Sequence, residues 1–225
     1  AGASLRADVA ATSVLRGSGG AWTVELATGE HVDADTVLLA VPAHAAARLA
    51  RTVDEELARS LASLRSGSTA AVFLGYRRAD VAHPLDGVGF VVPRALGRPI
   101  LAGTWVSSKW RARAPQDDVL LRAFLGGQDG EALLGRSDDE LAQVARDELR
   151  ALMGLEGQPL LSRVFRFAGA SAQMQVGHLA AMRALHERVR RVAPGLRVAG
   201  GGYEGIGIPD CVRQGTAAGR AMVED

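Results

Sequence analysis

The fold of this chain is decided by the stretch Val198–Gly215, whose sequence is VAGGGYEGIGIPDCVRQG. It predicts a short buried strand, then a glycine-rich loop, then a helix that begins at Pro209 or Asp210. Glycine lets a backbone approach a ligand closely because it has no Cβ. A helix N-terminus offers free N–H groups and partial positive charge, which suit a ring carbonyl or a phosphate. The spacing alone equally allows a plain glycine-rich turn between strand and helix.

Hydrophobic periodicity outside this stretch predicts a mixture of strands and helices, so the fold class is α+β (mixed α/β). Ser137 and Glu140 form the pattern of a capping box, which predicts the start of a helix that ends before Gly154. Strands are predicted at 9–15, 22–26, 31–33, 37–41, 69–76, 88–92, 100–106, 120–125, 160–167 and 196–199, and helices at 43–50, 54–64, 138–153, 179–192 and 210–223.

Composition excludes several classes of protein. Of the 225 residues, 48% are hydrophobic and 23% charged, which is an ordinary globular balance. The net charge of +1 and the interspersed acidic residues leave no basic stripe, so we expect no nucleic-acid partner. A single cysteine, Cys211, excludes a disulfide framework, and the histidines lack the spacing of metal ligands. We see no secretory signal, and the apolar run 36–47 is too short to span a membrane.

The segment from Tyr203 to Gly215 resembles the C-terminal flavin signature of the oxygen-dependent protoporphyrinogen oxidases. That family includes the coproporphyrinogen oxidases and belongs to the amine-oxidase-like flavoproteins. Further stretches resemble the same family in the same order: HPLDGVGFVVP at 83–93, LAGTWVSS at 101–108, RAP at 113–115, LLRAFLGG at 120–127 and QMQVGH at 173–178. Several motifs in one order are more specific than any single motif.

The resemblance implies the C-terminal portion of an FAD-dependent oxidase that converts a porphyrinogen to a porphyrin in heme biosynthesis. The flavin accepts hydride and O₂ is reduced to H₂O₂, so no catalytic side chain is demanded of this chain. It also implies that 1–65 and 176–225 form part of an FAD-binding domain, and that 66–175 form a substrate-binding domain built on an antiparallel sheet. The substrate is protoporphyrinogen or coproporphyrinogen.

Residue by residue, the resemblance implies two sets of contacts. The residues that would contact FAD are Val9, Ala40, Gly202, Gly205, Ile206, Gly207, Ile208 and Asp210; for Asp210, capping of the helix is an equally good interpretation. The residues that would face the tetrapyrrole are Val91, Trp105 and Phe124, each of which could instead belong to the core of the sheet.

The sequence departs from the family in two places. No G-x-G-x-x-G unit precedes the first strand, so we expect a C-terminal fragment of a longer enzyme that binds FAD weakly or not at all. The stretch 167–174 is expected to be a loop, and its small residues replace the bulky ones usual in the family. This puts substrate specificity and activity in doubt.

The missing parts lead to further expectations. We expect the strands 37–41 and 198–199 to pair with strands outside this sequence, and the open edges to favour a homodimer or partial disorder. The family implies a cytoplasmic location or one peripheral to the inner face of the cell membrane, with membrane contact only through parts absent here. Two other interpretations stay open: a non-catalytic module that binds a flat apolar ligand, and another amine-oxidase-like flavoenzyme.

Overall fold

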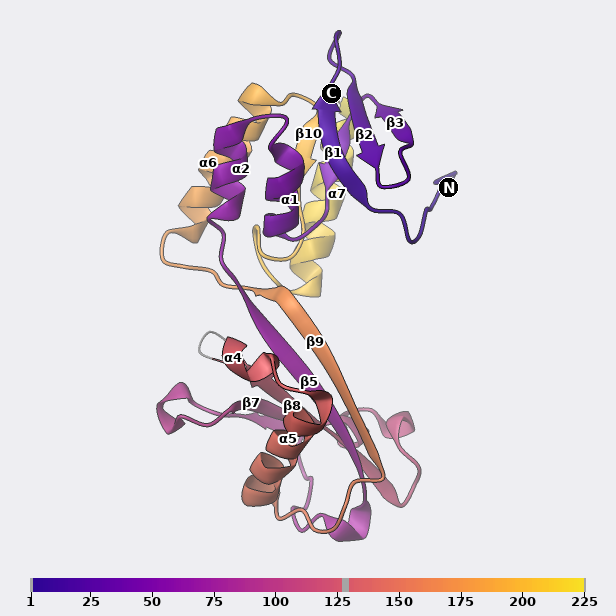
Figure 1. The fold of residues 1–225 in the computed structure, drawn as a ribbon, viewed down its shortest axis with the longest axis vertical. Coiled ribbons are helices and arrows are strands. Elements are labelled where there is room, and N and C mark those ends of the chain that lie inside the picture. Colours follow the sequence, from indigo (N-terminus) through magenta and orange to yellow (C-terminus); the bar gives the residue numbers. More distant parts are fainter. Residues whose placement is uncertain (1, 127–129, 225) are drawn as a thin grey trace. The chain divides into compact units, whose positions relative to one another are not determined.

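The computed structural model describes residues 2–126 and 130–224 and divides the chain into two compact units. Ala1–Arg65 and Ala172–Asp225 make up one, hereafter the terminal unit; Ser66–Ser171 make up the other, hereafter the inserted unit. Each unit combines helices with strands, which confirms the predicted mixed α/β class (Figure 1).

The elements lie close to the predicted positions. The strands are β1 Ala11–Arg16, β2 Trp22–Leu26, β3 His31–Ala34, β4 Val37–Leu39, β5 Ser66–Arg77, β6 Gly89–Val91, β7 Ile100–Trp105, β8 Asp118–Gly126, β9 Leu161–Ala172 and β10 Leu196–Val198. The helices are α1 Ala43–Ala50, α2 Glu55–Ala62, α3 Val106–Lys109, α4 Glu131–Leu134, α5 Asp138–Met153, α6 His178–Val192 and α7 Ile208–Glu224. The short 3-10 helices η1 to η3 begin at Arg78, Arg94 and Arg111.

The terminal unit contains two small sheets. Strands β1, β2 and β3 form an antiparallel meander, and β4 and β10 form a separate parallel pair. In that pair Val37 lies opposite Leu196, and Leu39 lies opposite Val198. The sequence predicted that both strands pair with strands outside it. This prediction is wrong for the edges along which β4 and β10 pair with each other. Two short apolar runs, remote in sequence, satisfy each other's backbone groups.

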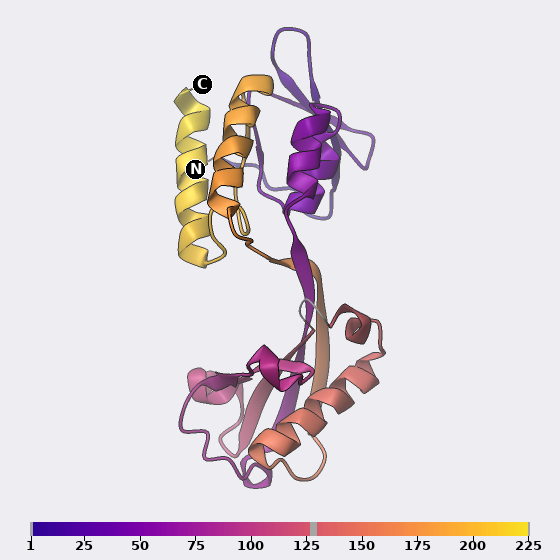
Figure 2. The same cartoon turned by 90° about the vertical axis from the view of Figure 1, so that its left-hand side faces the viewer.

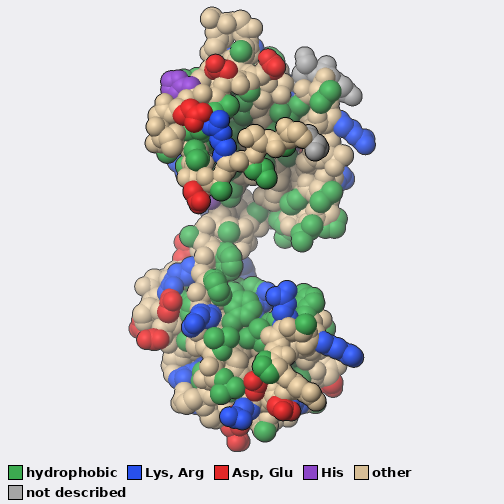
Figure 3. Space-filling model, turned by 90° about the vertical axis from the view of Figure 1, so that its right-hand side faces the viewer, with side chains coloured by type: hydrophobic (Ala, Val, Ile, Leu, Met, Phe, Trp, Pro, Cys, Tyr) green, Lys and Arg blue, Asp and Glu red, His purple; other side chains and the backbone are tan. Residues whose placement is uncertain are grey.

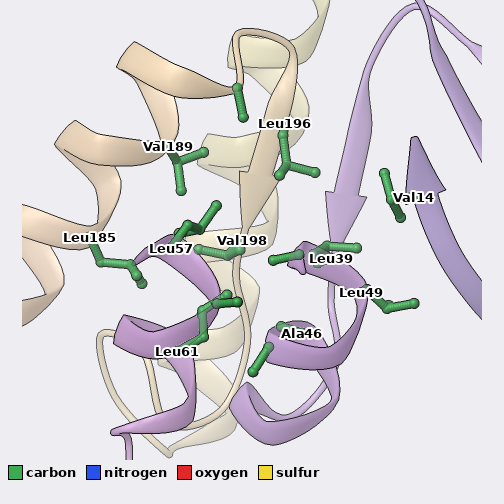
Figure 4. Close-up of a cluster of buried hydrophobic side chains, with 14 of the residues drawn as sticks. Val14, Leu39, Ala46, Leu49, Leu57, Leu61, Leu185, Val189, Leu196 and Val198 are labelled. Carbon is green, nitrogen blue, oxygen red and sulfur yellow. The ribbon is translucent and has the colours of Figure 1, made fainter. Parts of the chain in front are cut away.

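Helices α1, α2 and α6 cover this parallel pair and bury a single hydrophobic core. Figure 4 shows Leu185 and Val189 of α6, Leu57 and Leu61 of α2, and Leu49 of α1 around the strands. Each fully buried leucine stabilises the fold by roughly 1.5–3 kcal/mol relative to an exposed one. Asp54 caps the N-terminus of α2, and its Oδ1 accepts a hydrogen bond of 2.7 Å from the N–H of Leu57.

The inserted unit is a five-stranded sheet with the order β6-β7-β8-β5-β9. Figure 2 shows β5 and β9 running alongside each other and α5 along one side of the sheet. The predicted capping box is present, because Ser137 accepts from the N–H of Glu140 and Glu140 accepts from the N–H of Ser137. Gly154 ends α5 in the left-handed conformation, as expected.

The stretch 167–174 corrects one prediction. Residues 167–172 are not a loop but the last part of β9, which runs without a break to Ala172. The N–H of Gly169 donates to Oγ of Ser68 at 3.0 Å, and Leu161 lies against Gly75. Pairing with β5 therefore extends the strand through small residues that show no strand pattern of their own.

Candidate functional site

The glycine-rich loop lies at the carboxyl end of a parallel strand, a common position for ligand sites. Strands β4 and β10 are parallel, so their carboxyl ends meet at one edge of the pair. Ala40 follows β4 at this edge, and the loop that begins at Gly200 follows β10. The N–H of Ala199 donates to the carbonyl oxygen of Leu39 at 3.2 Å and holds the two ends together. Ligands of open parallel sheets bind beyond this edge.

The loop has a shape that requires glycine at two positions. Gly202 and Gly205 have φ angles of 97° and 148°, and the N–H of Gly202 donates to the carbonyl oxygen of Gly205 at 2.8 Å. A Cβ on Gly205 would lie 2.4 Å from Cγ of Asp210, and one on Gly202 would lie 2.6 Å from Cβ of Ala172. Any side chain would therefore collide as well as strain the backbone. Glycine at these two positions lets the loop pack directly against Asp210 and Ala172.

Tyr203 anchors the loop to the rest of the terminal unit. Its side chain is fully buried, and its hydroxyl donates to the carbonyl oxygen of Val41 at 3.0 Å, just past β4. Burial raises the pKa of Tyr203 to about 12. Nε2 of His178, the first residue of α6, lies 2.6 Å from the carbonyl oxygen of Tyr203. Since a carbonyl only accepts, His178 carries its proton on Nε2 there.

Gln214 of α7 closes the loop from the other side. Its Oε1 accepts a hydrogen bond of 3.3 Å from the N–H of Gly200, while its buried Nε2 has no partner among the described residues. Gln214 borders a cavity of about 510 Å³ that Val198, His186 and Ala218 also line. A buried amide donor without an acceptor costs free energy.

The N-terminus of α7 favours a neutral acceptor over a phosphate. Ile206 and Ile208 are exposed, and the first-turn N–H groups of a helix have no partner within the helix. Asp210 already places a carboxylate in this turn, 3.6 Å from Nη2 of Arg213. That carboxylate interacts favourably with the helix dipole and repels a second anion. Of the two ligand types that the sequence allows, a ring carbonyl therefore fits better.

The predicted cofactor residues divide into two groups. Ala40 and the segment from Gly202 to Asp210 come together at the edge of the parallel pair. Val9 lies outside it: it is half-buried and precedes β1, in the antiparallel meander. For Val9 and for all the other residues, contact with a cofactor stays a prediction.

The predicted substrate residues do not share one face of the inserted sheet. Trp105 is 6% exposed and belongs to the core beneath α5, where its ring contacts the tilted ring of His83 at a centroid distance of 4.5 Å. Val91 is exposed and shares a pocket of about 310 Å³ with Trp105. Phe124 alternates with the core residue Ala123, so it lies on the opposite face. Of the two interpretations weighed for Trp105, its position favours the core.

Sequence reasoning missed the anchors of the loop. Tyr203 and His178 are in the motifs quoted above, but no pattern says that the first is buried or that the second contacts it. The signal for Gln214 is its position, since it follows Asp210 by one helical turn and so faces the same strand end. Among the described residues no group of His, Cys, Asp or Glu could hold a metal ion. No helix in the described ranges is long and apolar enough to cross a membrane.

Known proteins resemble this chain over most of its length. The model of the family described as flavin containing amine oxidoreductase matches residues 1–223. Coproporphyrinogen III oxidase of Bacillus subtilis is 35% identical over 205 residues, which cover 91% of this chain and 43% of that protein. Coproporphyrinogen III oxidase of Mycobacterium tuberculosis H37Rv is 37% identical over 207 residues, 89% of this chain and 42% of the relative. The chain thus spans less than half the length of these relatives.

Solved structures agree with this result. The crystal structure of a protein titled putative protoporphyrinogen oxidase, from Exiguobacterium sp. 255-15, superposes with a TM-score of 0.84 at 29% identity. The match covers 96% of this chain and 47% of that one. Putrescine oxidase bound to putrescine shares the fold, with a TM-score of 0.68 at 14% identity over 97% of this chain and 49% of its own. Sequence and fold together place the chain in the family of flavin-containing amine oxidoreductases.

Proposed function

We propose that this chain is the C-terminal portion of an FAD-dependent oxidase that converts a porphyrinogen to a porphyrin and passes the electrons to O₂. One observation carries the proposal: the glycine-rich loop from Gly202 to Ile208 lies at the carboxyl edge of a parallel strand pair, in a chain 35% identical to a coproporphyrinogen III oxidase. The chain spans 43% of the length of that relative.

The loop suits the edge of a flavin ring. Gly205 and Gly207 present backbone without a Cβ, and the N–H groups of both have no backbone acceptor among the described residues. When bound, FAD supplies a hydride acceptor. The residues of this chain hold it in place: backbone N–H groups at the start of α7 would donate to ring carbonyl oxygens, and Tyr203 keeps the loop from shifting.

The relatives support a porphyrinogen as the substrate. Those compared above are named coproporphyrinogen III oxidases, and a chloroplast protoporphyrinogen oxidase of rice is 26% identical over 85% of this chain. The higher identity to the first group favours coproporphyrinogen over protoporphyrinogen. The exposed apolar face around Phe124 would receive the flat macrocycle.

The experiment uses the product of the complete reading frame that contains this sequence. We expect bound flavin absorbance between roughly 300 and 550 nm and growing porphyrin fluorescence when coproporphyrinogen is added under air. Gly205→Ala should lose flavin, since its Cβ would meet Asp210 at 2.4 Å. Gly219→Ala, at a position in α7 with open space around it, is the matched control and should keep it.

Three outcomes would contradict the proposal in different ways. A wild-type protein without flavin would favour a non-catalytic module that binds a flat apolar ligand. Flavin without turnover of either porphyrinogen would favour another flavoenzyme of the family. Equal flavin content in the Gly205→Ala and Gly219→Ala proteins would show that the loop does not hold the cofactor.

A further inference from the structure

Opposite the core beneath α5, the other face of the inserted sheet carries several aromatic side chains among the described residues. Along β5 and β8 the residues that alternate with core residues point to this face, among them Phe73 and Phe124. On β9, Phe165 and Phe167 are 51% and 47% exposed, and the ring of Phe165 meets that of Phe73 edge-on at 5.8 Å. Figure 3 shows hydrophobic side chains gathered in this unit with Lys or Arg side chains beside them.

Arg122 lies in the middle of these aromatic rings. It pairs across the sheet with Phe73, and its guanidinium carbon lies 4.4 Å from the ring centroid of Phe124 and 5.8 Å from that of Phe73. Nη2 donates to Oγ1 of Thr104 at 3.3 Å. The rings and the hydroxyl fix the orientation of the guanidinium, because cation–π contact favours a cation over the ring face.

No carboxylate among the described residues neutralises Arg122. Its Nε is buried without an acceptor, and burial alone lowers the pKa of its guanidinium. Other arginines of the same unit are paired: Nε of Arg98 lies 2.7 Å from Oε2 of Glu148, and Arg166 pairs with Asp138. A partly buried cation without a counter-charge is unfavourable. The described residues of the unit supply no such counter-charge, whereas a bound anion would supply one.

We propose that Arg122 binds a carboxylate of the substrate while the rings of Phe124 and Phe73 contact its flat apolar part. The inference rests on the proposed function, because porphyrinogens carry propionate groups around an apolar macrocycle. A guanidinium suits this task, since its N–H groups form a planar fork that matches a carboxylate. Thr104 accepts a hydrogen bond from Nη2, and Nε has no acceptor among the described residues. Arg122 would then fix the rotation of the macrocycle on the sheet.

The test measures binding of two porphyrins to this chain, each in the same detergent. The probes are coproporphyrin III and its full methyl ester, which has the same ring and no carboxylate, and binding is followed by porphyrin fluorescence. The proteins are wild type, Arg122→Gln and the matched control Arg77→Gln. Arg77 is an exposed arginine at the end of β5, so both variants remove the same charge from the same unit.

We expect Arg122→Gln to raise the Kd of the free acid by roughly ten- to a hundredfold, as for loss of a charged hydrogen bond. Arg77→Gln should change it less than about twofold, in line with a surface charge. The ester should bind all three proteins alike. Thermal unfolding should show that Arg122→Gln folds as well as wild type, because no charge partner is left unpaired.

Other results overturn the inference. It fails if wild type does not bind the acid, if acid and ester bind wild type equally, or if Arg122→Gln and Arg77→Gln behave alike. In the complete enzyme, the same variant should raise KM for the porphyrinogen and leave kcat nearly unchanged. A complete enzyme that turns over no porphyrinogen would refute the proposed function, while the comparison of acid and ester would still decide the role of Arg122.

Discussion

Replacing Tyr203 by phenylalanine removes one hydroxyl from the anchor of the glycine-rich loop. The Tyr203 hydroxyl is the only partner of the Val41 carbonyl oxygen among the described residues, and the side chain around it is fully buried. A buried carbonyl left without a donor costs about 2 kcal/mol. At a typical slope of about 2 kcal/mol per M, the midpoint of urea unfolding of the terminal unit should fall by about 1 M.

The assay must report on each unit separately, because a chain with two units need not unfold in one step. The three tryptophans allow this. Trp22 is buried in the terminal unit, whereas Trp105 and Trp110 belong to the inserted unit. Incorporation of fluorotryptophan gives each residue its own ¹⁹F resonance. Tyr203→Phe should shift the transition of Trp22 and leave the other two unchanged.

Tyr76→Phe provides the matched control. Tyr76 is as buried as Tyr203 but lies in the inserted unit, and its hydroxyl makes no hydrogen bond within the described ranges. Its loss should lower the free energy of unfolding by less than about 0.5 kcal/mol, since no buried acceptor is left behind. Equal effects of the two substitutions, each in its own unit, would refute the assigned role of the Tyr203–Val41 hydrogen bond.

Two further predictions concern titration and capping in the terminal unit. The pKa of Tyr203 rises from 10.0 to about 12 on folding. The free energy of unfolding should therefore stay constant up to pH 10 and then fall by roughly 3 kcal/mol by pH 12. Tyr203→Phe should remove this loss, which urea unfolding at each pH measures. Asp54→Ala should destabilise α2 by about 1 kcal/mol. Asp54→Asn should destabilise it less, because asparagine also caps helices. Hydrogen exchange of the backbone amides of α2 measures both effects. Arg188 holds the pKa of Asp54 below 3.8, so this residue's contribution should disappear only as the pH falls through that lowered pKa; loss already near pH 5 would contradict it.

Local patterns predicted the elements that depend on local physics. The strand Trp22–Leu26 and the helix Ala43–Ala50 occur with the predicted bounds, because alternation and flanking turn residues define them. The capping box at Ser137 sets the start of α5 for the same reason. Each of these signals operates over a few residues and needs no distant partner.

Features that depend on distant partners were not predictable in the same way. The final residues of β9 lie in a strand that pairs with β5, where Oγ of Ser68 also accepts a hydrogen bond from the N–H of Gly169. The side of the sheet on which Trp105 lies could not be inferred from alternation, since the pairing of β7 with β8 shifts register between Ile100 and Ala102. This bulge puts Trp105 in the core together with Ile100.

The candidate site shows the same division. The sequence identified the glycine-rich loop, but its anchors come from three elements: Val41 after β4, His178 of α6 and Gln214 of α7. Arg122 stood in a quoted motif without an assigned role, because its missing counter-charge becomes visible only when every neighbouring strand is in place.

The point where the chain leaves and re-enters the terminal unit has a consequence for how such enzymes diversify. The N–H of Gln173 donates to the carbonyl oxygen of Arg65 at 2.9 Å, so the exit and the return of the chain are neighbours. A segment inserted between these two residues lowers the stability of the terminal unit only by the entropy of closing a loop. Each doubling of the length of that loop adds only about 0.6 kcal/mol. We therefore expect that the inserted unit can be replaced by a segment of another length without disturbing the loop around Tyr203 and the residues that anchor it.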